Sequence, residues 1–220
     1  MLAGHIGAGL ALASAERRVN VGIFVVAGLF LDVVLWVFIL LGWESAAIPQ
    51  DFTRTHQPDF RFPYSHGLVA AVLWAMGFAA ALAAWARLPA RKRRLALLLA
   101  AAVFSHWLLD ALVHQPELPL LGDGSPRLGL GLWNHMPLAL VAESLVVGAG
   151  LWLFLAGSGW SRARCATLAA LVLATLVFTV VGMLFAPPPP SVAAMAGSSL
   201  AMLVLVCALC AWIGRAAGRA

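Results

Sequence analysis

Three ionisable side chains recur at every fourth position in the apolar stretch LALLLAAAVFSHWLLDALVH. They are His106, Asp110 and His114, and on a helix this spacing stacks them on one face. The stretch is long enough to span a bilayer, where imidazole and carboxylate groups are costly unless they face a protein interior and are paired, protonated or metal-bound. The stripe is therefore a candidate functional site, and other elements must supply its partners.

The composition indicates the environment of these elements. Of the 220 residues, 63% are hydrophobic and 10% are charged, and the mean hydropathy is +0.95, which is typical of an all-α polytopic membrane protein. Six apolar segments are close to the roughly 20 residues that a spanning helix requires, at 20–42, 64–88, 95–114, 132–157, 165–186 and 191–214. We expect one transmembrane domain over 1–220, in which 1–145 contains the site and 146–220 forms scaffold helices.

The N-terminal residues 1–14 are apolar but too short to cross a bilayer. They contain His5, carry no charge before the apolar run, and are followed by Glu16, Arg17 and Arg18. A cleaved signal peptide fits this pattern poorly. We expect a short half-helix or re-entrant segment that packs inside the bundle, because its free end has to be buried in protein or line a cavity.

Basic residues gather on every second connection, which predicts the orientation. The groups are Arg17/Arg18, Arg87 to Arg94, Arg162/Arg164 and Arg215/Arg219. By the positive-inside rule these connections and both termini are cytoplasmic, and the loops 43–63 and 115–131 lie outside. The same distribution explains the pI of about 10.1 without a nucleic-acid partner.

Helical rise places the ionisable residues in one layer. Counted from the cytoplasmic ends at about 1.5 Å per residue, four of them fall at roughly 17–23 Å: Asp32, His106, Asp110 and Glu143. His5 reaches roughly 18 Å if its segment rises into the bundle, and three other histidines fall at roughly 30–34 Å: His66, His114 and His135. The pattern predicts a polar pocket that opens outward.

The chemistry of this set is divalent metal binding. Imidazole nitrogen with carboxylate oxygen suits zinc, manganese or iron, and the cysteines, including Cys207-x-x-Cys210, are expected to pack in apolar helices. A metal-bound water would be a nucleophile at neutral pH, with Glu143 as its proton shuttle. The alternative for each residue is a hydrogen bond between helices without a ligand.

Several short motifs resemble the bacterial membrane-bound, metal-dependent hydrolase family related to YdjM, over about residues 1–145. They are His5-x-x-x-Gly9, Asp32, Ser65-His66 and FSHWLLDALVHQPELPL. The resemblance implies an inner-membrane, phospholipase C-like hydrolase whose metal ligands are His5, Asp32, His66, His106 and Asp110.

The chain departs from the family pattern at two motifs. Leu31 precedes Asp32 where the family usually has Pro-Asp and a further Asp, and Ser65-His66 lacks an upstream His-Arg. One metal instead of two, recruitment of His114 or Glu143 as ligands, and loss of activity all remain open.

The expected function is therefore hydrolysis of an ester or phosphoester bond in a lipid-like substrate at the outer half of a bacterial inner membrane, with zinc as the first candidate metal. Glu143 would move protons, and His114 and His135 would orient the substrate or the ligands. The alternatives are a proton- or ion-coupled transporter and a non-catalytic scaffold with a structural metal. Gly182 and Gly197 are candidates for a homo-oligomer surface.

Overall fold

The structure, a computed structural model, describes residues 1–85 and 91–215, except the side chains of five of them, residues 55, 83, 85, 91 and 92. Over this range the chain is all-α, as predicted. The helices are α1 (Leu2–Ala13), α2 (Val21–Leu40), α3 (Phe52–Thr55), α4 (Leu68–Trp85), α5 (Arg91–Val113), α6 (Met136–Leu155), α7 (Arg162–Phe185) and α8 (Val192–Arg215). Arg87 and Arg219, which entered the predicted orientation, lie outside the described residues.

Five helices are long and apolar enough to cross a membrane: α2, α5, the η1–α6 segment, α7 and α8. They coincide with five of the six predicted spans. α4 lies where the remaining span was predicted, at 64–88; its described apolar part, Leu68–Leu82, is shorter than the other five, and residues 86–88 lie outside the described range. Many large apolar side chains point outward, including Leu73, Leu97, Leu145 and Trp212, which suits a surface facing lipid.

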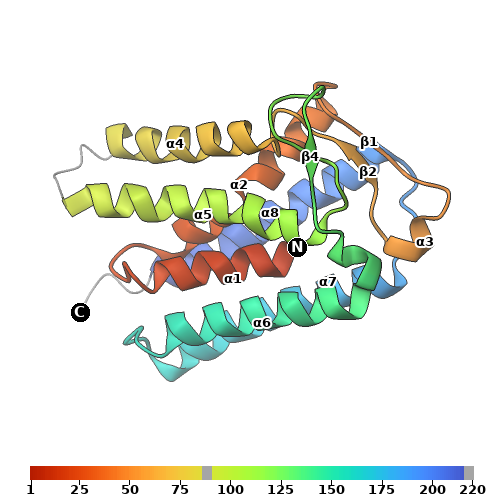
Figure 1. Ribbon diagram of the computed structural model, residues 1–220. Helices are drawn as coiled ribbons and strands as arrows, with labels where there is room; N and C mark the ends of the chain where they lie inside the picture. Colours follow the sequence, from red (N-terminus) through yellow and green to blue (C-terminus); the bar gives the residue numbers. More distant parts are fainter. Residues whose placement is uncertain (86–90, 216–220) are drawn as a thin grey trace.

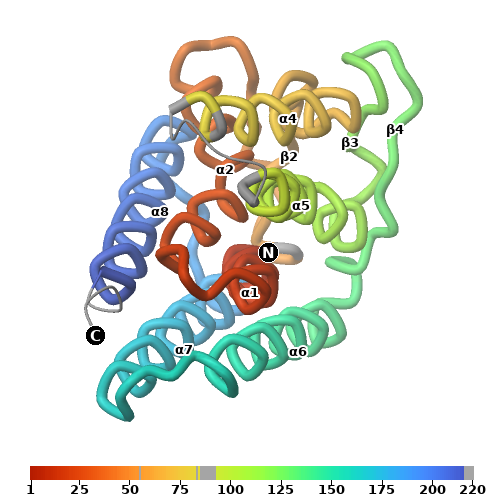
Figure 2. The backbone as a smooth tube through the Cα atoms, turned by 90° about the vertical axis from the view of Figure 1, so that its left-hand side faces the viewer, coloured from red at the N-terminus to blue at the C-terminus, as the bar shows by residue number. Residues whose placement is uncertain are grey.

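The short helix α1 is the centre of the bundle. Figure 2 shows it enclosed by α2, α5, α6 and α7, and Ala3, Ile6 and Leu10 on it are at most 1% exposed. The predicted half-helix inside the bundle is thus confirmed in its length and burial. One apolar core links α1 with α2, α5, α6, α7 and α8.

Glycines allow α1 to approach its neighbours closely. A Cβ atom at Gly7 would lie 2.7 Å from the Val146 carbonyl oxygen of α6. A Cβ atom at Gly28 of α2 would lie 2.7 Å from the His5 carbonyl oxygen of α1. Larger residues would push these helices apart, so Gly7 sets how near α1 comes to α6, and Gly28 sets how near His5 comes to α2.

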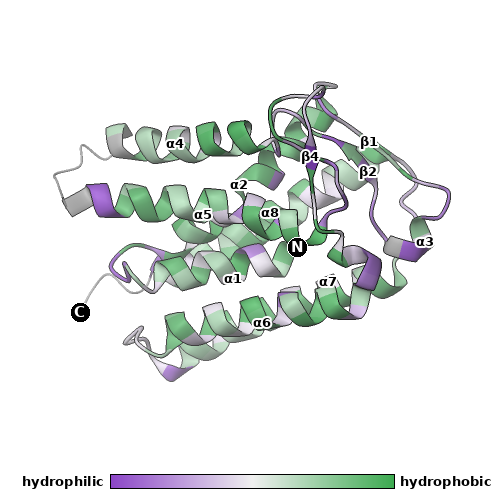
Figure 3. Cartoon of the chain, in the orientation of Figure 1, coloured by the Kyte–Doolittle hydropathy of each residue, from purple (hydrophilic) through white to green (hydrophobic). Residues whose placement is uncertain are grey.

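Two short hairpins and a 3-10 helix cover one end of the bundle. β1 (Ser45–Ala47) pairs with β2 (Asp59–Arg61), and β3 (Leu118–Pro119) pairs with β4 (Arg127–Leu128), while η1 (Leu132–His135) precedes α6. Figure 1 shows these elements gathered at the end of the bundle where α1, α4 and α6 begin and α2 and α5 end. We call this the loop end. Figure 3 shows that the helices are largely hydrophobic and that much of the hydrophilic colour lies at this end.

Candidate metal centre

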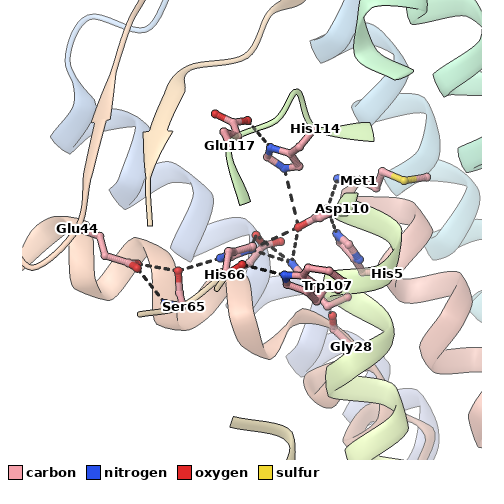
Figure 4. Close-up of polar contacts among 12 residues, drawn as sticks. Met1, His5, Gly28, Glu44, Ser65, His66, Trp107, Asp110, His114 and Glu117 are labelled. Atoms are coloured by element: carbon pink, nitrogen blue, oxygen red, sulfur yellow. Dashed lines mark hydrogen bonds and ion pairs between the residues drawn. The ribbon is translucent and has the colours of Figure 1, made fainter. Parts of the chain in front are cut away.

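Six ionisable side chains from four separate parts of the chain meet at the loop end of the bundle, and Figure 4 labels four of them, His5, His66, Asp110 and His114. Five of them are nearly fully buried, and the Asp32 side chain is 22% exposed. They are His5 on α1, Asp32 on α2, His66 just before α4, His106 and Asp110 on α5, and His114 immediately after α5. The structure therefore brings together all five residues that were predicted as metal ligands, with His114 beside them. We call these six residues the cluster.

Asp110 lies at the centre of the cluster. Its Oδ2 atom is 3.1 Å from His106 Nε2 and 3.4 Å from His66 Nε2. His114 Nε2 is 3.9 Å from the same oxygen. The other oxygen, Oδ1, is 3.2 Å from His5 Nε2. One carboxylate thus faces four imidazole rings.

Asp32 approaches the cluster from α2. Its Oδ1 atom is 3.5 Å from His106 Nε2 and 3.9 Å from His66 Nε2. The two Nε2 atoms of His66 and His106 are 3.2 Å apart, and the His5 ring stacks on the His106 ring at 3.6 Å. Within the described residues, two groups of three have ligand atoms within 4.8 Å of one another: His5, Asp32 and His106; and His66, His106 and Asp110.

The outer nitrogen of His106 is bonded to a backbone carbonyl. His106 Nδ1 lies 2.8 Å from the Gly28 oxygen. A carbonyl oxygen only accepts hydrogen bonds, so Nδ1 carries a proton, and in the neutral ring Nε2 presents its lone pair to the two carboxylates. Gly28 therefore contributes twice, through this bond and through the close approach of α1 to α2.

A buried relay determines the tautomer of His66. Glu44 Oε1 accepts the backbone N–H groups of Tyr64 and Ser65, both at 2.8 Å, and Glu44 Oε2 accepts the Ser65 hydroxyl at 2.7 Å. Having donated its proton, Ser65 Oγ is an acceptor for His66 Nδ1 at 2.8 Å. The Nε2 lone pair of His66 then points into the cluster.

Glu44 is 4% exposed. Burial raises the pKa of its carboxyl group, and the hydrogen bonds from Ser65 and Tyr64 oppose that shift. The backbone at His66 is also held by Trp107, whose Nε1 donates to the His66 carbonyl at 2.9 Å.

His114 follows the same pattern at the end of α5. Its Nδ1 atom lies 2.5 Å from Glu117 Oε1, so the acceptor carboxylate again directs Nε2 toward Asp110. The ring packs against Trp133 with centroids 4.1 Å apart. Glu117 Oε2 also accepts the Phe60 backbone N–H at 3.3 Å, which ties the two hairpin regions together.

The donor set fits a divalent cation. In His66, His106 and His114 the outer nitrogen has an oxygen acceptor, and the inner nitrogen turns a lone pair toward carboxylate oxygens, as is usual for metal-binding histidines. Two lone pairs 3.2 Å apart repel each other unless a proton or a cation lies between them. Among the described residues, neither nitrogen of His5 nor Asp110 Oδ1 has a hydrogen-bond partner, although Asp110 Oδ1 is within ion-pair range of His5 Nε2, at 3.2 Å, and of the N-terminal amine, at 3.8 Å.

The structure places the two remaining predicted residues differently. Glu143 is 2% exposed and lines the same cavity as the cluster, and its Oε1 accepts the Gly4 backbone N–H at 3.1 Å. That bond stabilises the N-terminal turn of α1. His135 is exposed at the end of η1 and is not among the cavity residues. It does not join the cluster, because the η1 turn directs its side chain outward.

The cluster opens into a cavity of about 600 Å³. Asp32, His66, Asp110 and His114 line one part of it, and side chains of α7 and α8 line another. The segment 146–220, which was predicted as scaffold, therefore also contributes a wall of the cavity.

The sequence interpretation missed the groups that orient the ligands. The sequence interpretation assigned no role at the site to Glu44, to Glu117 or to the Gly28 carbonyl. Glu117 had a usable signal, because it follows His114 by three residues. Glu44 is 21 residues from Ser65, and no local spacing connects the two.

Comparisons with known proteins do not extend this description. No protein family, no curated protein and no solved structure matches the chain. The argument for function therefore depends on the geometry of the cluster and the cavity.

Proposed function

We propose that the cluster binds a divalent cation, with zinc first and manganese or iron as alternatives, and that this membrane protein hydrolyses an ester or phosphoester bond in a lipid-like substrate. One observation carries the proposal: three imidazoles, each with its outer nitrogen bonded to an oxygen, direct their inner nitrogens at two carboxylates. This is the second-shell arrangement that orients metal ligands. The resemblance to YdjM-related hydrolases is consistent with the same residues.

The residues of the chain have distinct parts in such a reaction. A divalent cation supplies Lewis acidity and lowers the pKa of water. His66, His106 and Asp110 would hold it, with His5 and Asp32 completing the ligand set. Glu143 lines the cavity and has one oxygen bonded to Gly4, so the other oxygen is placed to accept a proton. His114 would orient substrate or ligands at the cavity wall.

The opposite half of the bundle favours a hydrolase over a transporter. Alternating access requires a polar path through both halves of the membrane domain. Beyond the cluster, toward the end opposite the loop end, the core includes apolar side chains that are at most 2% exposed: Leu10, Phe24, Leu99, Val147 and Phe154. The adjoining cavity favours an enzyme over a scaffold with a structural metal, because a purely structural site needs no space for a substrate.

The proposed orientation follows from basic residues at the end opposite the loop end. Arg17 Nη2 donates to the Leu153 carbonyl at 2.8 Å, and Arg94 Nη2 donates to the Ala15 carbonyl at 3.0 Å. Cations at helix C-termini are favourable, and cations at one membrane face indicate the cytoplasmic side. The cluster would then face the outer side of a bacterial inner membrane.

Metal analysis of the purified protein tests the proposal. We expect bound metal in the wild type and loss of it in His106→Ala and Asp110→Ala. Ser105→Ala is the matched control, because Ser105 is on the same helix and its hydroxyl donates to the Ala102 carbonyl of its own turn. Equal metal content in all four proteins would overturn the metal site.

A turnover assay then tests the reaction. Metal-dependent release of product from lipid phosphoesters or esters, lost in Asp110→Ala, is the expected result. Metal-dependent uptake into vesicles without any product would favour the transporter instead.

A further inference from the structure

The wall of the cavity that lies away from the cluster is apolar. It is formed by α7 and α8, which lie on the far side of α1 and α2 from α4 and α5 (Figure 2). Its large side chains are Phe178, Met183, Met195, Met202 and Leu203. None of the cavity residues on these two helices is charged.

Two of the three hydroxyl groups in this wall are bonded within their own helices, and the third belongs to Ser199. Thr179 Oγ1 donates to the Thr175 carbonyl at 3.0 Å, and Ser198 Oγ donates to the Met195 carbonyl at 3.0 Å. Their donors are used, so this part of the wall offers a ligand mainly apolar surface.

Three methionines make the wall adaptable. Methionine side chains are flexible and polarisable, and they adjust to ligands of different shape. Met183 is also tied to the loop end, because Gln57 Nε2 lies 2.7 Å from its sulfur atom. The Gln57 contact thus fixes the wall at Met183, and the side chains of Met195 and Met202 can adopt different rotamers.

One position in the wall leaves open space. Gly182 lines the cavity, and a Cβ atom built on it meets no other atom within 4 Å. A larger side chain there would enter free volume. Gly197 on α8 has equally open surroundings but does not line the cavity.

The cavity therefore has a charged end and an apolar end. Its volume of about 600 Å³ lies within the roughly 300–1,000 Å³ of typical small-molecule sites. We propose, building on the hydrolase function above, that α7 and α8 hold the apolar tail of a single-chain amphiphile whose phosphate or ester head lies at the cluster, and that the space at Gly182 sets the tail length accepted.

Binding of alkyl phosphates of increasing chain length to the full-length, metal-loaded protein in nanodiscs tests this proposal. Titration calorimetry measures the affinity, with empty nanodiscs subtracted for partitioning into lipid. We expect the wild-type affinity to rise about fourfold for each methylene that enters the cavity, and to level off when the cavity is full.

Gly182→Leu fills the open space and is expected to move this plateau to shorter chains. Affinity for the longest chains should fall about 16-fold or more, which corresponds to two or more excluded methylenes, while affinity for the shortest chains and the metal content stay unchanged. Gly197→Leu is the matched control and should behave like the wild type. Met202→Ala shortens a side chain of the wall and so enlarges the cavity. This variant should move the plateau to longer chains.

The outcomes separate this proposal from the hydrolase function. An affinity that does not depend on chain length, or equal shifts in both glycine variants, would overturn the tail site even if metal binding and turnover persist. Chain-length dependence that persists in a protein without metal or turnover would support the tail site and reject the hydrolase.

Discussion

The two ends of the bundle have opposite chemistry although the same helices run through both. At the loop end, α1, α2 and α5 bring His5, Asp32, His106 and Asp110 together. At the other end the same helices contribute Leu10, Phe24 and Leu99, each 0% exposed. Within residues 1–85 and 91–215, the buried His, Asp and Glu side chains lie toward the loop end. The buried His, Asp and Glu side chains are thus concentrated at the loop end, and the core at the opposite end is apolar.

This contrast also separates two kinds of charge at the loop end itself. The cluster is buried, and its members face one another. The Arg61–Asp123 pair joins the two hairpins at 2.8 Å, but its side chains are 66% and 35% exposed. Arg61 and Asp123 are thus a solvent-exposed pair outside the cluster.

A carboxylate placed in the apolar half of the bundle, opposite the loop end, should have the largest effect. Leu99→Asp puts an unpaired charge into the core of α5, about two turns before His106, and should destabilise the protein by about 3 kcal/mol or more. Leu99→Asn removes a similar volume without the charge and should cost clearly less. Thermal unfolding in detergent measures both. An Asp variant as stable as the Asn variant would show that the half opposite the loop end tolerates an unpaired charge.

Acidification should release metal from the cluster before it unfolds the helices. Metal binding requires neutral imidazoles and ionised carboxylates, so protons compete with the cation. As the pH falls, metal affinity should decrease by up to about tenfold per pH unit for each imidazole ligand that has to lose a proton before it binds the metal. Chelator competition measures the affinity, and circular dichroism should show constant helix content. Metal affinity that is constant between neutral and mildly acidic pH would contradict histidine ligation.

Reversal of the Glu44 relay should have an intermediate effect. In Glu44→Gln the amide oxygen can still accept the two backbone N–H groups while its NH2 group donates to Ser65. The Ser65 hydroxyl then donates to His66 Nδ1, so the His66 Nε2 proton faces the cluster and opposes metal binding. We expect metal affinity to fall about 10- to 100-fold, the usual range for such outer partners. Ser65→Ala removes the relay without reversing it and should have the smaller effect.

The stability of Glu44→Gln provides its control. Because burial raises the pKa of Glu44, this group contributes stability below its ordinary pKa and loses that contribution as the pH rises through the raised value. The metal-free Gln variant should therefore unfold at no lower temperature than the wild type at neutral pH. A large loss of stability would indicate that any loss of metal comes from misfolding instead of the tautomer.

The exposed pair should have the smallest effect. The hydrogen bond from Arg61 lowers the pKa of Asp123, so the pair contributes stability above the ordinary pKa of aspartate and loses it as the pH falls through the lowered value. Both groups are exposed and screened by salt. Arg61→Ala should leave the unfolding temperature and the metal content unchanged at physiological salt. Loss of metal in this variant would show that the hairpins, and not only the helices, hold the cluster in place.

Hydropathy and spacing were sufficient to predict the helical membrane fold, five of the spans and the central half-helix. These are local properties: an apolar run of about 20 residues has few alternatives to a spanning helix, and the i, i+4 period places His106 and Asp110 on one face regardless of their neighbours. Depth counting placed Asp32 and His5 in the same layer for the same reason. It could not give rotation about the helix axis, which decides whether a side chain faces the cluster or the outside.

Only the tertiary structure decided the rest. His135 had a depth similar to that of His66 and His114, but the η1 turn leaves it exposed. The contacts of Glu44 with Ser65, of Gly28 with His106 and of Gly4 with Glu143 join residues that are 21, 78 and 139 positions apart. Such contacts depend on which helices pack together and how closely, and glycines such as Gly28 set that distance. The residue types determined what chemistry the chain can perform, and the packing of α1 against α2, α5 and α6 determined where it is assembled.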